Sequence, residues 1–238
     1  MKNFEKFPLL GVSLTNVKER EVLEFIITGL EKQTEKYYIV TPNPELLVIA
    51  DKDPKYKDIL NRAKLALVDG IGIVWAVRLL GHPLIERIHG VNLLESLCSS
   101  VAKQPITVGF LGAGPSVAEK TAECLKKKYP GLKVGLVSQE WSDSLKNNKV
   151  DILFVAFGSP KQEIWISEHI NNISARVLIG VGGSFDFISG KVPRAPKFLR
   201  QLGLEWLFRL IIQPWRIKRQ MSLLKFVYLV LKEKFNKD

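Results

Sequence analysis

Short runs of β-branched and aliphatic residues alternate along the chain with segments whose apolar positions recur at helical spacing. Such alternation is typical of a doubly wound α/β fold. Several runs are apolar at consecutive positions, as in strands covered on both faces. We therefore predict a mostly parallel sheet with helices on both faces, built from these strands: Tyr37 to Asn43, Leu65 to Gly70, Thr107 to Ala113, Lys133 to Gln139, Asp151 to Gly158 and Ala175 to Gly183.

Both ends of the chain carry helical patterns. Near the start, Asn16 is a favoured N-cap residue and predicts a helix that runs to about Lys32. After Gly190 the strand signal stops, and the pattern predicts two helices that are broken near Pro214. We expect an α/β catalytic core over residues 1–190 and a helical appendage over residues 191–238.

Composition and charge narrow the class of protein. The 238 residues are 46% hydrophobic and 25% charged, which is typical of a globular chain with a substantial core. We expect a cytoplasmic protein, because no stretch is long and apolar enough to span a membrane and residues 1–10 lack a signal-peptide pattern. The net charge of +11 is concentrated in residues 191–238, where twelve Lys and Arg face three acidic residues. The appendage should therefore meet an anionic partner.

The few cysteines and histidines form no metal-binding or disulfide pattern. Cys98 and Cys124 lie in helix-like segments without CxxC spacing, so we predict that both are reduced and buried. The scattered His82, His89 and His169 lack the spacing of zinc ligands, so no metal is expected.

Polar or glycine-rich sequence follows each predicted strand. Because ligands of open α/β sheets bind beyond the carboxyl ends of the strands, we expect one shared cleft there. Its candidate residues are Thr41, Asn43, Asp69, Gly112, Gly114, Glu140, Gln162 and Gly183.

The glycine loop after the third strand has two interpretations. Gly112 and Gly114 could present free N–H groups to a diphosphate, or they could only form a tight turn. Ser116 and Glu119 predict a capping box for the next helix. Val117 stands where a dinucleotide fingerprint has its third glycine, which weakens the hypothesis of a dehydrogenase.

Other polar residues also leave alternatives open. Asp69 could cap the helix that follows it or deprotonate a bound hydroxyl. Glu140 could bind a ribose hydroxyl, and Gln162 could bind a sugar or only nearby backbone. Arg87 would ordinarily be solvated, whereas Arg194 lies in a rigid turn between prolines.

Seven motifs in matching order resemble the WecG/TagA/CpsF glycosyltransferases. They are TPNPE at 41–45, DGIGIVWA at 69–76, ERIHG at 86–90, GSPKQEIW at 158–165, GVGGSFDFISG at 180–190, RAP at 194–196 and GLEWLFRL at 203–210. The resemblance implies a Rossmann-like fold with a C-terminal appendage. It also implies transfer of a sugar from a UDP-sugar to an undecaprenyl-diphosphate-linked acceptor. TagA members transfer N-acetylmannosamine to lipid-linked N-acetylglucosamine for teichoic acid linkage units; a uronic acid or glucose donor is the alternative.

The same resemblance implies roles for individual residues. Asp69 becomes the catalytic base, Thr41 and Asn43 line the pocket, Arg87 contacts the diphosphate or sugar, and Gln162 binds sugar. From the appendage, the basic residues that complete the site are Arg209, Arg216 and Arg219. The sequence Gln213-Pro-Trp-Arg departs from the family, which more usually has an acidic residue before that proline.

These expectations combine into one hypothesis. An inverting transfer without metal or cofactor takes place in the core, while basic and aromatic residues of the appendage dock on the anionic inner surface of the cell membrane. A homo-oligomer would hide the apolar appendage in water. The main alternative from another class is an RNA-binding protein, because aromatic residues interleaved with basic ones also suit RNA.

Overall fold

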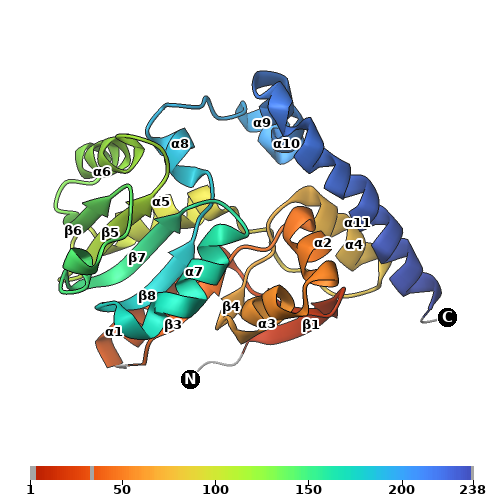
Figure 1. Ribbon diagram of the computed structural model, residues 1–238, viewed down its shortest axis with the longest axis horizontal. Helices are drawn as coiled ribbons and strands as arrows, with labels where there is room; N and C mark the ends of the chain where they lie inside the picture. The colour runs from red at the N-terminus through yellow and green to blue at the C-terminus, as the bar shows by residue number, and fades with distance from the viewer. Residues whose placement is uncertain (1–3, 33–34, 237–238) are drawn as a thin grey trace.

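The computed structural model describes residues 4–32 and 35–236. Its main sheet has six parallel strands in the order β4-β3-β8-β7-β5-β6 (Figure 1). All six predicted strands form, but each ends earlier than predicted, because the polar residues at the carboxyl ends belong to loops. The strands are β3 (Tyr37–Val40), β4 (Leu65–Ala66), β5 (Thr107–Gly112), β6 (Lys133–Ser138), β7 (Val150–Ala156) and β8 (Ala175–Gly180).

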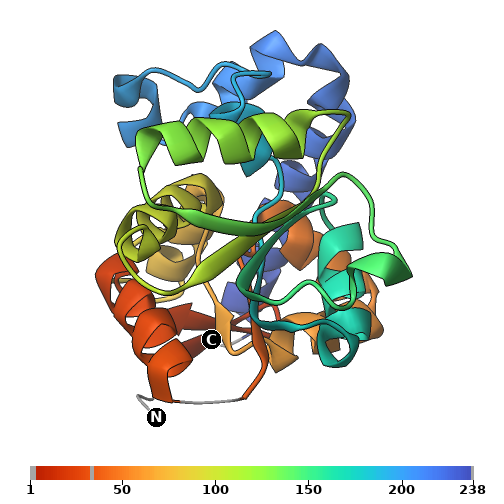
Figure 2. The same cartoon turned by 90° about the vertical axis from the view of Figure 1, so that its left-hand side faces the viewer.

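Helices cover both faces of this sheet (Figures 1 and 2), as expected for a Rossmann-like fold. One apolar core lies between the sheet and α1 (Glu19–Lys32), α5 (Gly90–Val101), α6 (Val117–Lys128) and α8 (Ser184–Ile188). The core on the other face lies against α2 (Pro44–Lys52), α3 (Pro54–Arg62), α4 (Ile71–Leu79) and α7 (Lys161–His169). Short 3₁₀ turns follow β6 and α7, at η1 (Asp143–Leu145) and η2 (Ile170–Asn172).

An antiparallel hairpin near the start of the chain was not predicted. It consists of β1 (Glu5–Leu9) and β2 (Val12–Asn16), and Gly11 takes a positive φ of 77° in its turn. Asn16 is the last residue of β2, so the prediction that it caps α1 is wrong. Its side chain accepts a hydrogen bond from the backbone N–H of Ile85 instead.

The segment after residue 190 is helical, and its predicted break near Pro214 is confirmed. Its elements are α9 (Lys197–Gln201), α10 (Glu205–Ile212), η3 (Pro214–Arg216) and α11 (Ile217–Phe235). Helix α11 runs alongside α2 and α4 (Figure 1), where Phe226 and Val230 are buried. Lys237 and Asp238 lie outside the described residues.

Two local predictions about α6 are wrong. Ser116 takes a left-handed conformation with φ of 57° and makes no side-chain cap, so the capping box does not form. Cys124 points outward from α6 and is exposed, although Cys98 is buried as predicted and burial raises the pKa of its thiol. Within residues 4–32 and 35–236, none of the helices combines the length and apolar character needed to cross a bilayer.

Candidate active site

A cavity of about 780 Å³ opens at the carboxyl edge of the sheet. Loops that follow β3, β4, β5, β7 and β8 form its walls together with α10 and α11. This is where an open parallel sheet binds its ligand, and it corresponds to the predicted shared cleft. The cavity brings together these predicted site residues: Thr41, Asn43, Asp69, Arg87, Gly114, Gln162, Gly183, Arg209, Arg216 and Arg219.

Asp69 presents a carboxylate to this cavity from the loop after β4. Its backbone N–H donates to the carbonyl oxygen of Pro42, which holds the loop beside the end of β3. Gly70 occupies the N-cap position of α4, where no side chain makes a capping hydrogen bond, so the interpretation of Asp69 as a cap is wrong. Its Oδ1 lies 3.1 Å from Nδ1 of His89. The Asp69 carboxylate is thus held by an imidazole and remains partly open to the cavity.

Three arginines of the appendage converge on the same cavity. Arg219 forms a bidentate pair with Glu45, with Nε–Oε1 and Nη2–Oε2 distances of 2.8 Å. Arg209 lies near Asp186, at 3.7 Å between Nη2 and Oδ2, and burial lowers its pKa. Burial, followed by the charges of Arg209 and Arg219, lowers the pKa of Arg216 to about 10. Because these three positive charges lie close together in a partly buried cavity, the cavity favours an anionic ligand.

Two predicted glycines leave space for positively charged side chains of the appendage. A Cβ atom at Gly183 would lie 2.6 Å from Nη2 of Arg209, and one at Gly114 would lie 2.8 Å from Nζ of Lys191. Gly112 is different, because it does not line the cavity. Its φ of 107° and its close approach to the backbone of β7 explain the glycine structurally, as in the tight-turn interpretation.

Gln162 lies at the start of α7 with its amide orientation fixed. Its Oε1 accepts a hydrogen bond from the backbone N–H of Gly182 at 3.0 Å, and its Nε2 donates to Oε1 of Glu163 at 2.7 Å. Glu163 is fully buried and also accepts hydrogen bonds from Ser159 Oγ at 2.9 Å and Tyr56 OH at 3.1 Å. Burial raises the pKa of Glu163, and these hydrogen bonds oppose the rise.

Three further predicted residues support the cavity wall as well as lining it. Thr41 Oγ1 donates to the carbonyl oxygen of Gly180 at 3.2 Å. The side-chain oxygen of Asn43 caps α2. Arg87 Nη2 donates to the carbonyl oxygen of Arg200 at 3.0 Å, so this arginine joins the loop before α5 to the appendage.

Besides Gly112, two predicted site residues lie outside the cavity lining. Arg194 does not line the cavity; its Nη2 donates to Oδ1 of Asn92 at 2.6 Å, and its Nε lies 3.6 Å from Oε1 of Glu205. Through these contacts Arg194 connects its turn to α5 and α10. Burial lowers the pKa of its guanidinium. Glu140 is exposed and follows β6, the edge strand, so it is separated from the loops that form the cavity.

Comparison with known proteins decides the family. Residues 7–238 match the model of the glycosyl transferase WecG/TagA/CpsF family. The chain belongs to this family. The resemblance of its seven motifs is thereby confirmed, and the protein is a glycosyltransferase rather than a dehydrogenase or an RNA-binding protein.

Two relatives in this family are similar along most of their length. A protein of Bacillus spizizenii strain W23 is 38% identical over 207 residues, which cover 84% of this chain and 80% of the relative. A protein of Staphylococcus aureus strain NCTC 8325 is 34% identical over 240 residues, which cover 98% of this chain and 94% of the relative. Both are named N-acetylglucosaminyldiphosphoundecaprenol N-acetyl-beta-D-mannosaminyltransferase.

Several side chains in the cavity of this glycosyltransferase were not predicted from sequence. They are His89, Lys191, Glu45 and Asp186. His89 follows Arg87 in the ERIHG motif, and Lys191 is the first basic residue of the appendage, so both positions carried a signal. Glu45 and Asp186 also lie in quoted motifs, TPNPE and GVGGSFDFISG, but the motifs do not show that each residue pairs with an arginine distant in sequence.

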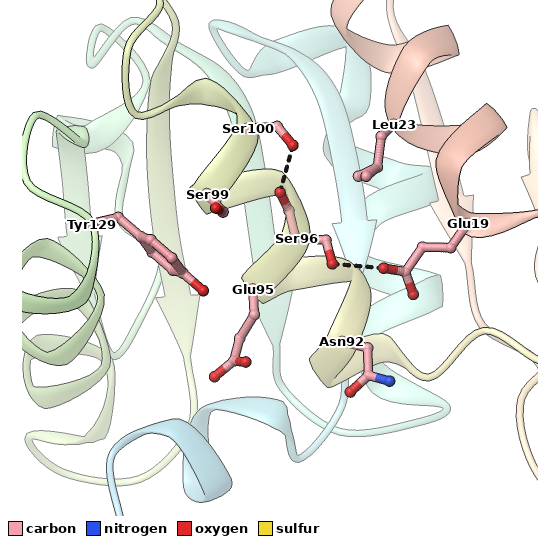
Figure 3. Close-up of a pocket in the computed structure, with 8 residues that line it drawn as sticks. All are labelled: Glu19, Leu23, Asn92, Glu95, Ser96, Ser99, Ser100 and Tyr129. Atoms are coloured by element: carbon pink, nitrogen blue, oxygen red, sulfur yellow. Dashed lines mark hydrogen bonds between the residues drawn. The ribbon is translucent and has the colours of Figure 1, made fainter.

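A second, smaller hollow of about 420 Å³ lies beside α1 and α5 (Figure 3). Its polar groups bind one another: Ser96 Oγ donates to Oε1 of Glu19 at 2.6 Å, and Glu95 pairs with Lys128 at 3.1 Å. Among residues 4–32 and 35–236, no group of three or more His, Cys, Asp and Glu side chains is placed to hold a metal ion.

Proposed function

We propose that the protein transfers N-acetylmannosamine from UDP-N-acetylmannosamine to N-acetylglucosamine linked to undecaprenyl diphosphate. One observation carries the proposal: a single cavity joins the carboxylate of Asp69 to the guanidinium groups of Arg209, Arg216 and Arg219. The printed names of the relatives support this sugar and this acceptor. The reaction would form the linkage unit of teichoic acid.

The proposed reaction is a single displacement. Asp69 takes the proton of the acceptor 4-hydroxyl as its oxygen forms a bond to the anomeric carbon of the donor sugar. The bond from that carbon to the β-phosphate oxygen breaks, and its electron pair leaves with UDP. Attack opposite to the leaving group inverts the configuration. A positioned general base contributes typically about 10²- to 10⁴-fold in rate.

The arginine cluster supplies the second part of catalysis. Negative charge grows on the β-phosphate as UDP departs, and fixed guanidinium groups stabilise that transition state more than the ground state. The lowered pKa of Arg216 supports this role, because an anion beside it would relieve both its burial and its repulsion by Arg209 and Arg219. Lys191 and Arg87 add positive charge at the cavity wall. In this proposal guanidinium groups neutralise the diphosphate without a metal ion.

The appendage, residues 191–238, has a second proposed role as a membrane anchor. Its helix α11 exposes an apolar stripe at alternating spacings of four and three residues: Ile217, Met221, Leu224, Tyr228, Leu231 and Phe235. An anionic leaflet attracts neighbouring Lys and Arg by about 1 kcal/mol each. The aromatic residues of the appendage were expected to dock on the membrane, but one of them, Phe226, is only 1% exposed and packs on the core, so the prediction is wrong for this residue. We propose peripheral docking through the stripe.

The test of the catalytic proposal is Asp69→Asn, which keeps the size of the side chain and removes its basicity. We expect UDP binding to persist and turnover to fall by about 10²-fold or more. Asp58→Asn is the matched control, because this exposed carboxylate lies on α3 outside the cavity and pairs with Arg62. Turnover of Asp69→Asn at the wild-type level excludes Asp69 as the base.

Membrane docking is tested by vesicle sedimentation with the full chain. The triple substitution of Met221, Leu224 and Tyr228 by Ser should weaken binding to vesicles that contain phosphatidylglycerol. Two double variants with the same change in net charge test whether the position of the lysines matters for binding. Lys232→Glu with Lys234→Glu should weaken binding, whereas Lys126→Glu with Lys127→Glu on α6, on the opposite side of the molecule from α11 (Figures 1 and 2), should not. Equal binding of all variants refutes the docking surface.

The same stripe supports a proposal about assembly. A spacing of four and three residues is that of a helix seam that packs against another helix. We propose that two or more copies cover this stripe in water and that the membrane competes for it. Sedimentation velocity over a wide concentration range should show reversible association, which vesicles reduce. A monomer at every concentration contradicts this proposal.

A further inference from the structure

We propose that His89 is a positioning residue for the catalytic base, through the 3.1 Å contact between its Nδ1 and Oδ1 of Asp69. The inference rests on the proposed function, because it gives His89 a role only if the Asp69 carboxylate removes the acceptor proton. It goes beyond that function by assigning a part in proton removal to a side chain that never exchanges the proton itself.

The pair is partly shielded and lies within the cavity. The side chains of His89 and Asp69 are 17% and 26% exposed, and their nitrogen and oxygen atoms are 3.1 Å apart. Both residues line the cavity of about 780 Å³. Their contact therefore bears directly on the carboxylate that faces the substrates.

The backbone around each partner is fixed independently of the contact. The N–H of Ile88 donates to the carbonyl oxygen of Val68 at 2.9 Å, and the carbonyl oxygen of His89 accepts from the N–H of Leu93 at 3.0 Å. Asp69 is held by its own bond to Pro42. The imidazole thus approaches Asp69 from a rigid position at the start of α5, and it can fix the rotation of the carboxylate.

This contact has a chemical consequence. A carboxylate partner selects the imidazole tautomer with its proton on Nδ1, so the ring presents an N–H to Oδ1 and leaves Oδ2 for the acceptor hydroxyl. His89 therefore sets which carboxylate oxygen of Asp69 faces the acceptor.

Other charged groups in the cavity belong to separate pairs or to the anion site. Glu45 pairs with Arg219, and Asp186 lies beside Arg209. Glu205 lies near Arg194, which is outside the cavity lining. The remaining charged side chains that line the cavity, within the described ranges, are Arg87, Lys191 and Arg216. An effect of His89 on turnover can thus be separated from an effect of the arginines on anion binding.

The experiment compares His89→Ala with His89→Asn in steady-state kinetics. Alanine removes the donor, and we expect kcat to fall at least tenfold while the KM for the sugar nucleotide stays within twofold. The amide nitrogen of asparagine can occupy the place of Nδ1 and present an N–H to Oδ1. We expect His89→Asn to recover most of kcat. His169→Asn, on α7 outside the cavity, is the matched control.

The outcomes separate this inference from the proposed function. If Asp69→Asn is inactive but His89→Ala has wild-type kinetics, the role of His89 is refuted and the base remains. If Asp69→Asn is active, the proposed function fails first. Thermal unfolding and UDP binding identify a variant that fails to fold, and recovery of kcat in His89→Asn then decides. Equal losses of kcat in both His89 variants indicate a purely structural role and overturn the proposal.

Discussion

Replacing Glu163 separates the two contributions of a fully buried carboxylate, its charge and its hydrogen bonds. Glu163→Gln keeps the shape and an acceptor oxygen but removes the charge. Glu163→Ala removes the partner of Tyr56 OH, Ser159 Oγ and Gln162 Nε2. Each partner left without a hydrogen bond in a buried place costs about 1–3 kcal/mol of folding free energy. Removing the buried carboxylate also removes the cost of its desolvation, which offsets part of the total for the three partners. We expect Glu163→Ala to lower the free energy of unfolding by about 2–5 kcal/mol.

The contribution of the Glu163 charge can be measured from the dependence of stability on pH. Burial raises the pKa of Glu163 in the folded state, so folding favours the protonated form. The stabilising contribution is present below the pKa of the unfolded state, about 4.3, and is lost as pH rises through the folded pKa. Relative to the wild type, Glu163→Gln should therefore gain stability as pH rises from 4 toward 8.

Urea unfolding at several pH values between 4 and 8 measures both effects. Glu168→Gln is the control, because Glu168 is exposed on the same helix. A constant difference between Glu163→Gln and the wild type over this range refutes the assignment of a raised pKa. If Glu163→Ala is as stable as the wild type, the hydrogen bonds of Glu163 do not stabilise the fold as expected.

Three further predictions concern the appendage and its contacts. Arg216→Gln should weaken UDP binding about tenfold by calorimetry, about 1.4 kcal/mol. We also expect the wild type to lose affinity for UDP above pH 10, where the Arg216 guanidinium with a pKa of about 10 loses its charge, and Arg216→Gln to show a smaller loss. Phe226→Ala should lower the free energy of unfolding by about 3–5 kcal/mol, and Leu224→Ala on the exposed stripe by less than about 0.5 kcal/mol, in chemical denaturation. Gly183→Ala should displace the guanidinium of Arg209 and lower kcat, with a smaller effect on thermal unfolding.

The sheet was predictable because its buried strands impose a continuous apolar pattern that the sequence carries directly. The hairpin was not predicted, because β1 and β2 are short and the first of them contains Lys6 and Pro8 among its apolar residues. Asn16 illustrates the same limit. It has the chemistry of a cap, but tertiary hydrogen bonds with Glu5 and Ile85 hold it at the end of a strand.

The location of the site was also predictable, since parallel strands bring their carboxyl ends to one edge. Its pairwise geometry was not, because it depends on contacts between distant segments. Gln162 was identified from its helix start, yet the buried Glu163 that orients it has an ordinary place in sequence. Glu140 shows the converse. It follows a strand, as the other candidate residues do, but β6 lies at the edge of the sheet and the loop after it does not line the cavity.

The single helix α11 links the active site to the exposed surface of the appendage. Phe226 and Val230 bury one face against the core, while Arg219 reaches Glu45 at the cavity. Met221 and Leu224 lie on the exposed stripe between these anchors. Because these residues lie within a few turns of one helix, the proposed docking of the stripe would fix the orientation of the cavity toward the docked surface. Loss of the Phe226 contact should therefore impair catalysis as well as stability, whereas polar substitutions on the stripe should impair only the reaction with membrane-bound acceptor.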